Sequence, residues 1–317
     1  MSTHRWRRPI QVKGRSYLVG PLRFIDVFTE KDKQPVHINL PDKVTASNGV
    51  IFHLGGAVKK GGNGVVFEAT RYTATNRYAG PCAVKFLRQM TGARMDRFNN
   101  EVRILRDVGG SNNVSEYFGD GALQHVIPGG KTISVPWVGM SMGRDNFRVV
   151  IDKGGPLANT ELKSVAMEMC VAVRHLHNSG FIHRDIKPDN FVRKPHGGGA
   201  MMIDFGIAKR TGEDVSGRPL DEFTRNDEFV GPANFSSPEL LAYARDKRRL
   251  VDHRSDMFQL GKLIWFMATG DVSAGVPSKK KDPFGGTLHA IVYDLLQDDP
   301  DDRMGTMDEM IARMDKL

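Results

Sequence analysis

The chain has 317 residues, of which 40% are hydrophobic and 26% are charged, a composition that excludes a disordered or fibrous protein. This length suffices for one large domain or for two lobes that each have a core. The longest apolar runs are far shorter than the roughly 20 residues of a membrane span, and the N-terminus lacks the apolar segment of a signal peptide. Cys82 and Cys170 lie far apart inside apolar stretches, which favours a reducing compartment over a disulfide framework. We therefore expect a cytoplasmic protein with no membrane partner.

The net charge of +8 at pH 7 is unevenly distributed along the chain. The first 25 residues hold several Lys and Arg and no acid, and two further basic clusters lie at 245–249 and 279–281. Such clusters attract nucleic acid or acidic proteins in some proteins and are ordinary solvated surface in others. We favour solvated surface, because no nucleic-acid-binding signature is present, and keep a nucleic acid or an acidic partner of the basic N-terminus as the alternative. The oligomeric state is left open.

Short apolar runs predict strands in the first half of the chain. Residues 1–47 carry three such runs between turn residues, and we expect this segment to be a basic extension that packs on the next domain. Residues 48–140 carry three more and form a strand-rich region. The predicted strands are 15–19, 24–28, 37–40, 50–54, 64–69 and 82–87.

One helix, predicted over residues 95–108, interrupts the strand-rich region, because apolar side chains recur there at helical spacing. The apolar residues of this face are Phe98, Val102, Leu105 and Val108. Glu101 falls on the same face, and a buried carboxylate is costly unless it is paired. The pattern therefore predicts that a cation from elsewhere in the chain contacts Glu101.

Helical periodicity dominates from about residue 155. An apolar stripe predicts an amphipathic helix over 159–177, and Gly180 follows as a stop. Residues 256–270 are apolar nearly all round, which predicts a helix buried inside its domain. The order is therefore a small β-rich lobe, a connector near 139–146 and a larger helical lobe. A cleft between two lobes is a natural ligand site.

The run Gly61-Gly62-Asn63-Gly64, followed by Val66, predicts either a phosphate-binding loop or a tight turn between two strands. A complete G-x-G-x-x-G-x-V pattern would need glycine at position 59, where this chain has Lys59. The run by itself does not distinguish the two alternatives.

Five further motifs follow the glycine run. They are Ala83-Val84-Lys85 in a strand, Glu101 on the helix, His183-Arg184-Asp185 with Asn190 five residues after Asp185, Asp204-Phe205-Gly206, and Ser237-Pro238-Glu239. A lone Asp-Phe-Gly has little meaning, but the whole series at this spacing is not a chance match. The series covers about residues 48–315 and resembles the eukaryotic-type Ser/Thr protein kinase family, stand-alone bacterial members included.

The resemblance implies an α+β, bilobal fold with an ATP cleft between the lobes. A basic extension at 1–47 would precede a β-rich N-lobe at 48–140 with one key helix, and a helical C-lobe at 141–317. The resemblance also implies ATP- and Mg²⁺-dependent transfer of the γ-phosphate to Ser or Thr hydroxyls of protein substrates, the kinase itself included. The alternative function is a pseudokinase that binds ATP as a regulatory scaffold.

The family pattern implies a role for each charged residue of these motifs. Lys85 would contact the α- and β-phosphates and be held by Glu101. Asp185 would accept the proton of the substrate hydroxyl, and Lys187 would neutralise charge on the γ-phosphate. A lysine at position 187 is typical of Ser/Thr kinases rather than tyrosine kinases.

The pattern also implies the ligands of ATP and Mg²⁺. The implied metal ligands are Asn190 and Asp204, which offer the hard oxygen atoms that Mg²⁺ prefers. The implied ATP-binding residues are Lys59, Gly61, Gly62, Asn63, Gly64, Val66, Ala83, Lys85, Met140, Met142 and Val192. The implied structural contacts are a hydrophobic column of His183, Phe205 and Leu105, an ion pair of Glu239 with Arg303, and a bond from Asp256 to the backbone of the catalytic loop.

Two positions depart from the family pattern. Lys59 replaces the first glycine of the loop, and Pro232 replaces a threonine that usually braces the catalytic Asp and Lys, so this brace is absent or rebuilt. Loss of Lys85, Asp185 or Asp204 would have favoured the pseudokinase, and all three are present. A small-molecule kinase of related fold usually lacks the arginine before the catalytic Asp and the Pro-Glu segment, both of which are present here.

Arg184 precedes the catalytic Asp, and in the family such an arginine often pairs with a phosphate on the activation segment, here 204–239. The candidate phosphorylation sites are Thr211, Ser216 and Thr224. Asp227-Glu228 lie where the phosphate commonly sits, and our hypothesis is that these acids partly replace it. Ordinary solvated loop acids are the alternative.

Overall fold

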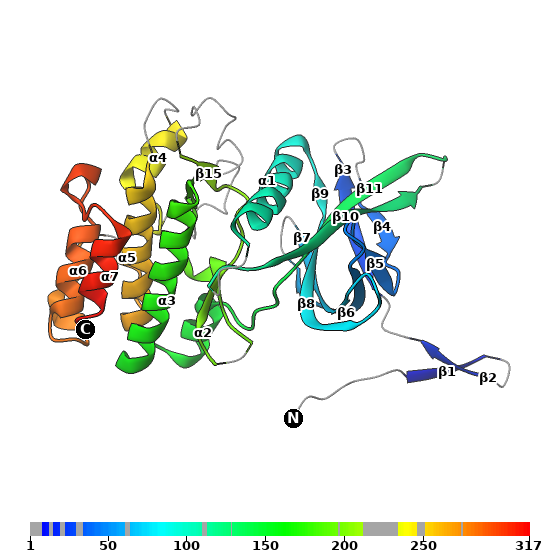
Figure 1. Cartoon of the computed structure of the whole chain (residues 1–317), viewed down its shortest axis with the longest axis horizontal. Coiled ribbons are helices and arrows are strands. Elements are labelled where there is room, and N and C mark those ends of the chain that lie inside the picture. The colour runs from blue at the N-terminus through cyan, green and yellow to red at the C-terminus, as the bar shows by residue number, and fades with distance from the viewer. Residues whose placement is uncertain are drawn as a thin grey trace. The chain divides into compact units, whose positions relative to one another are not determined.

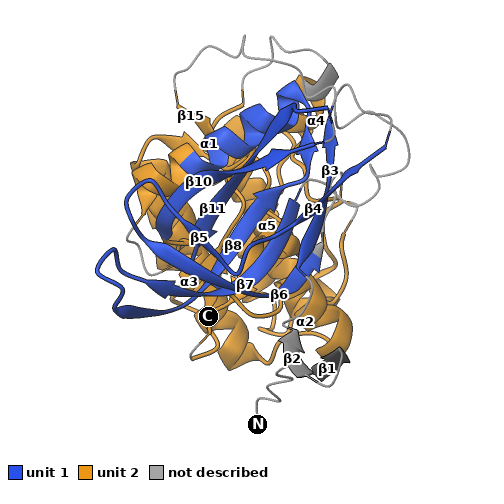
Figure 2. Ribbon diagram, turned by 90° about the vertical axis from the view of Figure 1, so that its right-hand side faces the viewer, with its two compact units in different colours: residues 1–102, 117–142 blue, residues 103–116, 143–317 orange. Residues whose placement is uncertain are grey.

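The computed structural model describes residues 8–12, 15–19, 23–29, 34–60, 64–109, 113–127, 129–195, 197–211, 234–245, 251–273 and 275–317. The chain divides into two compact units (Figure 2): the first comprises residues 1–102 and 117–142, the second residues 103–116 and 143–317. Several residues named above lie outside the described ones: Gly61, Gly62, Asn63, Ser216, Thr224, Asp227, Glu228 and Pro232. The domain boundaries predicted at residues 48 and 141 stay predictions.

The first unit contains a six-stranded antiparallel sheet with the strand order β10-β11-β8-β7-β6-β5 (Figure 1). Its strands are β5 (Lys43–Thr45), β6 (Ile51–Lys60), β7 (Gly64–Tyr72), β8 (Tyr78–Leu87), β10 (Tyr117–Val126) and β11 (Thr132–Met140). Successive side chains of a strand point to opposite faces of the sheet. One face is therefore apolar and buried in the core, with Phe67 and Phe86 edge to face at 5.8 Å.

A second, three-stranded sheet of the same unit has the order β4-β3-β9. It consists of β3 (Phe24–Thr29), β4 (Val36–Asn39) and β9 (Gln89–Met90), and β3 pairs with β9 in parallel. Ile25, Val27 and Ile38 are buried in the same core as the six-stranded sheet. A hairpin of β1 (Arg8–Val12) and β2 (Arg15–Val19) precedes this sheet. The strands predicted at 15–19, 24–28 and 37–40 are thus confirmed.

Helix α1 (Gly92–Val108) follows β9 and confirms the helix predicted over 95–108, with three additional residues at its start. The predicted inner face is buried, including Glu101, which is 3% exposed. The last turns of α1, from Arg103 on, belong to the second unit.

The second unit is predominantly helical. Its helices are α2 (Phe147–Gly154), α3 (Asn159–Asn178), α4 (Pro238–Arg245), α5 (His253–Thr269), α6 (Thr287–Leu295) and α7 (Met307–Met314), with single 3₁₀ turns η1 (Pro188–Asn190), η5 (Lys279–Lys281) and η6 (Pro300–Asp302). Helix α5 is buried from Ser255 to Ala268, as its all-round apolar sequence predicts. Helix α3 packs against α5 and α7 and buries the stripe that predicted it.

Two short antiparallel strand pairs of the second unit carry the loops with the chemical motifs. Strand β12 (Phe181–Ile182) pairs with β15 (Lys209–Arg210), and β13 (Phe191–Arg193) pairs with β14 (Ala200–Met202). The loop with Asp185 joins β12 to β13, and the loop with Asp204 joins β14 to β15. The β-rich first unit and helical second unit confirm the predicted α+β class.

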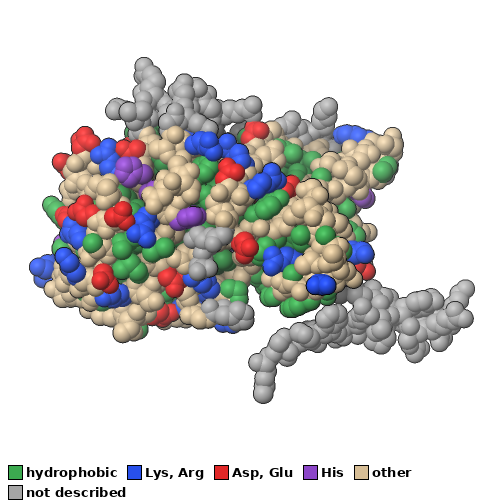
Figure 3. Space-filling view, viewed as in Figure 1, with side chains coloured by type: hydrophobic (Ala, Val, Ile, Leu, Met, Phe, Trp, Pro, Cys, Tyr) green, Lys and Arg blue, Asp and Glu red, His purple; other side chains and the backbone are tan. Residues whose placement is uncertain are grey.

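Within the described residues, no helix has both the length and the apolar character that a membrane crossing needs. Acidic and basic side chains alternate over the described helices of the second unit on the face drawn in Figure 3. This mixture fits ordinary solvated surface there. Most of the basic N-terminal residues lie outside the described side chains, so their predicted partner stays untested.

Candidate active site

The register of the first sheet places several of the predicted ATP-binding residues on one face. Val66 lies opposite Lys85, Lys85 lies opposite Val138, and Ala83 lies opposite Met140. Directly opposite residues share a face, and residues two apart on one strand share it too. These side chains therefore line the face that turns away from the core residues of the same strands, such as Val84.

Lys85 and Glu101, which the sequence predicts to pair, form an ion pair within the first unit. Lys85 Nζ donates to Glu101 Oε1 at 2.8 Å and to Oε2 at 2.7 Å. The Lys85 side chain is 18% exposed and that of Glu101 is 4% exposed. Separating a pair this shielded is costly, because it leaves an uncompensated charge inside the protein. Glu101 thereby fixes where the ammonium group of Lys85 lies.

The hairpin of β6 and β7 places Lys59 opposite Val66. Lys59 is exposed, whereas Gly64 lies against the neighbouring strand: a Cβ at Gly64 would come within 2.8 Å of the carbonyl oxygen of Phe86. The glycine at position 64 is therefore required by close backbone packing. The tip of the hairpin, 61–63, lies outside the described residues.

In the second unit, Asp185 is the centre of a small hydrogen-bonded cluster. Lys187 Nζ donates to its two carboxylate oxygens at 2.9 and 2.8 Å. Asn190 Nδ2 donates to the Asp185 carbonyl oxygen and to Oδ2, both at 2.8 Å. Lys187 and Asn190 thus converge on the carboxylate of Asp185, because the 3₁₀ turn η1 folds the chain back on itself.

Asp256, at the start of α5, holds the backbone of this loop. Its Oδ2 accepts from the N–H of His183 at 2.8 Å, its Oδ1 accepts from the N–H of Arg184 at 2.7 Å, and His177 Nε2 lies 2.9 Å from Oδ2. Gln259, one turn further along α5, accepts from the N–H of Ile186 at 3.0 Å and donates to the carbonyl of Arg184 at 3.2 Å. The loop is therefore fixed at successive backbone groups by one buried helix.

The pKa values of Asp185 and Asp256 are shifted in opposite directions. Burial raises the pKa of Asp185 above its ordinary value, against the opposing effect of the Lys187 charge. Burial favours the neutral form of Lys187, but the neighbouring charge of Asp185 outweighs it and the net pKa of Lys187 is raised. Burial also acts against ionised Asp256, yet the hydrogen bonds from His177 and the loop backbone hold its pKa below the ordinary value.

Asn190 and Asp204 offer oxygen atoms that fit a magnesium ion. Because Asn190 Nδ2 is bound to Asp185, the amide orientation is fixed and Oδ1 is left without a hydrogen bond from any described residue. The Asn190 carbonyl accepts from the N–H of Ile203, next to Asp204. Asp204 is exposed and adopts a φ of 65°, a left-handed conformation uncommon outside glycine. A carboxylate and an amide oxygen are a suitable donor pair for Mg²⁺ that keeps water and phosphate as its other ligands.

Two further predicted contacts, His183 with Phe205 and Glu239 with Arg303, are present in the second unit. The rings of His183 and Phe205 lie 5.4 Å apart, and both side chains are fully buried. Arg303, whose side chain is 0% exposed, donates to Glu239 Oε1 at 2.7 Å and to Oε2 at 2.8 Å. Leu105 is buried as well.

Two residues of the site, Gly143 and Gln259, were not predicted from the sequence. Gly143 lies so close to Val192 that a Cβ there would come within 2.2 Å of the valine side chain. Gln259 is one of the few polar residues in a mostly apolar helix, and this polar interruption is the sequence signal that marks it. Met140 ends β11, and Met142 follows in the segment that leads to α2.

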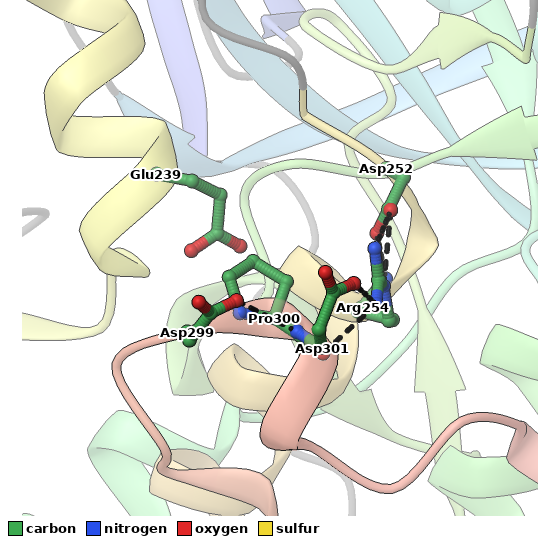
Figure 4. Close-up of a pocket in the computed structure, with 6 residues that line it drawn as sticks. All are labelled: Glu239, Asp252, Arg254, Asp299, Pro300 and Asp301. Atoms are coloured by element: carbon green, nitrogen blue, oxygen red, sulfur yellow. Dashed lines mark hydrogen bonds and ion pairs between the residues drawn. The ribbon is translucent and has the colours of Figure 1, made fainter.

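A cavity of about 180 Å³ lies elsewhere in the second unit and contains none of the predicted site residues (Figure 4). It is lined by Glu239, Asp252, Arg254, Asp299, Pro300 and Asp301. Arg254 is occupied by Asp252 at 2.7 Å and by Asp301 at 2.6 Å. Its one arginine is therefore already paired, Glu239 is paired with Arg303, and among the described residues no group of His, Cys, Asp and Glu has the arrangement of a metal site.

Comparison with known proteins agrees with this geometry. A sequence profile described as "Protein kinase domain" matches residues 52–284. The probable serine/threonine-protein kinase PknB of Corynebacterium glutamicum is 32% identical over 170 residues, which cover 53% of this chain and 23% of that protein. The probable serine/threonine-protein kinase CE0033 of Corynebacterium efficiens is 29% identical over 255 residues, 78% of this chain and 34% of that protein.

A third relative, serine/threonine-protein kinase AfsK of Streptomyces griseus, is 30% identical over 220 residues, 69% of this chain and 24% of that protein. The matched region is therefore between 23% and 34% of the length of these three relatives. The profile, in contrast, spans most of the chain and contains every motif from Lys85 to Glu239. The chain belongs to the protein kinase domain family.

Proposed function

We propose that this protein transfers the γ-phosphate of ATP to serine or threonine hydroxyls of protein substrates, itself included. The observation that carries the proposal is the cluster around Asp185, in which Lys187 and Asn190 bind a carboxylate whose loop is fixed by Asp256. A carboxylate held in this way can orient a hydroxyl and accept its proton. Lys187 beside it is typical of Ser/Thr kinases, and the relatives reported above are named serine/threonine-protein kinases.

The reaction forms a bond between the substrate oxygen and the γ-phosphorus and breaks the bond between that phosphorus and the β–γ bridging oxygen, releasing ADP. Asp185 accepts the proton of the substrate hydroxyl while the new P–O bond forms. Lys187 neutralises the γ-phosphate, and Lys85, fixed by Glu101, neutralises the α- and β-phosphates. Since the chemistry needs positioning and charge neutralisation more than covalent help, buried and rigidly held charges suit it.

Asn190 Oδ1 and the carboxylate of Asp204 would hold Mg²⁺, which the protein kinase family generally uses together with ATP. The ion supplies charge neutralisation of the phosphates when bound. The residues proposed to contact ATP itself are those named from the sequence, and of these Val66, Ala83 and Met140 share the Lys85 face of the sheet. A cytoplasmic location and a partner for the basic N-terminus stay predictions.

The test is a transfer assay with γ-labelled ATP and Mg²⁺ on the full chain, beside Asp185→Ala and Asp204→Ala. Labelled serine or threonine with the wild type and not with either variant supports the proposal. Nucleotide binding without transfer to generic substrates or to the protein itself would contradict it and favour the ATP-binding scaffold. Arg174→Gln serves as the control, because Arg174 forms an exposed pair with Asp308 on another part of the surface.

A further inference from the structure

Strand β3 lies outside the residues that the kinase profile matches, yet it contacts the segment between Lys85 and Glu101. The profile begins at residue 52, inside β6, whereas β3 spans Phe24–Thr29. Phe28 pairs with Gln89 and Thr29 with Met90 in the parallel β3–β9 ladder. We propose that β3 is a positioning strand of the phosphotransfer site, which acts on Glu101 by holding the segment that leads into α1.

The contacts of Arg88 with β3 are made by both backbone and side chain. The N–H of Phe28 donates to the carbonyl oxygen of Arg88 at 2.8 Å. Arg88 Nε donates in return to the carbonyl oxygen of Asp26 at 3.1 Å, and its guanidinium lies 5.4 Å from the centroid of the Phe28 ring. Met90 packs against the core that β3 helps to form. These reciprocal contacts fix the segment 88–90 against β3.

Strand β3 is itself firmly attached to the first unit. Ile25 and Val27 are 1% and 0% exposed in its core. Arg23, directly before the strand, donates to the carbonyl oxygen of Leu54 in β6 and pairs with Asp42. Because β3 pairs with β9 and the residue directly before it, Arg23, contacts β6, β3 links the large sheet to the segment that leads into α1.

A contact outside the helix can help to fix the start of α1. The helix begins at Gly92, a residue that costs backbone entropy in a helix, and its first turn contains no acid to favour the helix dipole. Glu101 lies within the same helix and reaches Lys85 on β8, a strand that ends directly before Arg88. The Lys85–Glu101 pair therefore closes a loop whose middle is held by β3.

This inference rests on the proposed function, since it assigns β3 to the positioning of a pair that serves phosphotransfer. The test variant is Arg88→Met, which keeps the length of the side chain but removes the guanidinium contacts with Asp26 and Phe28. Phe28→Ala is the second variant, chosen because Phe28 is 37% exposed and its removal leaves the core intact. Arg77→Met, at an exposed arginine in the β7–β8 turn, is the matched control.

The first measurement is amide hydrogen exchange on the full chain without nucleotide, followed by mass spectrometry. We expect Arg88→Met and Phe28→Ala to speed exchange over residues 92–101 and to leave α3 unchanged. Unchanged exchange over 92–101, or an equal increase throughout the first unit, would overturn the proposal. This measurement needs no phosphotransfer, so it decides on β3 even if the proposed function fails.

The second measurement is the transfer rate in a double-mutant cycle of Arg88→Met with Glu101→Gln. If β3 acts through Glu101, Arg88→Met lowers kcat about 10- to 100-fold in the wild-type background and has no further effect in Glu101→Gln. Arg88→Met should also lower Tm, because contacts with β3 are lost, and the fall in Tm should be similar with Glu101 and with Gln at position 101. An equal loss of kcat in both backgrounds, or a fall in Tm with unchanged kcat, would assign β3 a purely structural role.

Discussion

Asp256 Oδ1 accepts the backbone N–H of Arg184 at 2.7 Å, at a residue whose φ of 67° lies in the left-handed region. A non-glycine residue in that region costs about 1–3 kcal/mol and persists only where its surroundings enforce it. Asp256 is fully buried, and its second carboxylate oxygen accepts from the neighbouring N–H of His183. The buried helix α5 thus imposes the loop conformation that presents Asp185.

Replacement of Asp256 by asparagine should therefore both destabilise the second unit and lower kcat. The amide has one acceptor oxygen where three donors now converge, so at least one buried N–H loses its partner. We expect a loss of about 2–4 kcal/mol in the free energy of unfolding and a larger effect on kcat than on KM. Urea unfolding and steady-state kinetics measure the two effects.

Asp308→Asn is the matched control, because Asp308 pairs with Arg174 on the exposed surface. It should change the unfolding free energy by less than about 0.5 kcal/mol. If Asp256→Asn is as mild as this control, the hydrogen bonds of Asp256 do not maintain the loop.

Short-range patterns predicted much of this architecture. The spacing of apolar residues located α1, α3 and α5, because a helix face repeats every three to four residues whatever its surroundings. The cost of a buried carboxylate predicted a cation beside Glu101, and the motif series supplied Lys85. The recognition of a Ser/Thr-type protein kinase from these motifs is confirmed by the matched profile and the named relatives.

Contacts between residues far apart in the chain could not be predicted from the sequence. Nothing in the runs at 24–28 or 89–90 indicates that they pair in parallel across more than sixty residues of chain, because strand partners leave no local trace. Gly143 is one glycine among 34, and its role appears only where Val192 comes within contact of it. The sequence predicted that the extension packs on the next domain, but not that Ile25 and Val27 belong to the same core as the six-stranded sheet.

Two truncations test which part of the N-terminal segment the first unit needs for its stability. Removal of residues 1–22 leaves every described core side chain in place, and we expect a Tm close to that of the full chain. Removal of residues 1–45 deletes Ile25, Val27 and Ile38, whose burial contributes roughly 5–9 kcal/mol, as much as the whole stability of many domains. The first unit should then be unfolded. Near-equal Tm values for both truncations, measured by circular dichroism, would contradict this.

Lys59 and Lys85 should differ sharply in their effect on transfer. Lys59 is exposed opposite Val66, so Lys59→Gly removes only a screened charge and should change KM for ATP by less than about fivefold. Lys85→Ala removes the partner of buried Glu101 and should lower kcat by about 100- to 1,000-fold. Initial rates over a range of ATP concentrations distinguish the two. Loss of activity in Lys59→Gly would mean that the hairpin contacts phosphate at residue 59.

The pH dependence of kcat should report the raised pKa of Asp185. Because the carboxylate must be ionised to accept a proton, activity falls as the pH drops through this pKa. Lys187→Met removes the charge that lowers the pKa of Asp185, so the acid limb should move to higher pH while the maximal rate falls. Rate profiles from about pH 5 to about pH 9 at saturating ATP measure this shift.

Lys153→Met is the control for the pH profile, because Lys153 forms an exposed pair with Asp145. Titration of ATP itself is common to all three proteins and cancels in the comparison. An acid limb that stays in place in Lys187→Met, or moves to lower pH, would show that Asp185 does not set it.

Lys262, one turn after Gln259 on α5, offers a stabilising substitution. It is 9% exposed on α5, with Nζ 5.6 Å from the centroid of the Phe258 ring and no ion pair to any described residue. Burial lowers its pKa, so the cost of its charge is fully present below that lowered pKa; between the lowered and the ordinary lysine pKa the unfolded chain binds more protons than the folded one, and stability rises with pH. Lys262→Met removes this cost and should raise Tm by about 2–4 °C at pH 7 and by less at pH 10. Thermal unfolding at both pH values, with exposed Lys280→Met as the control, measures the difference. A lower Tm for Lys262→Met at pH 7 would mean that the contact with Phe258 outweighs the cost of burying the charge.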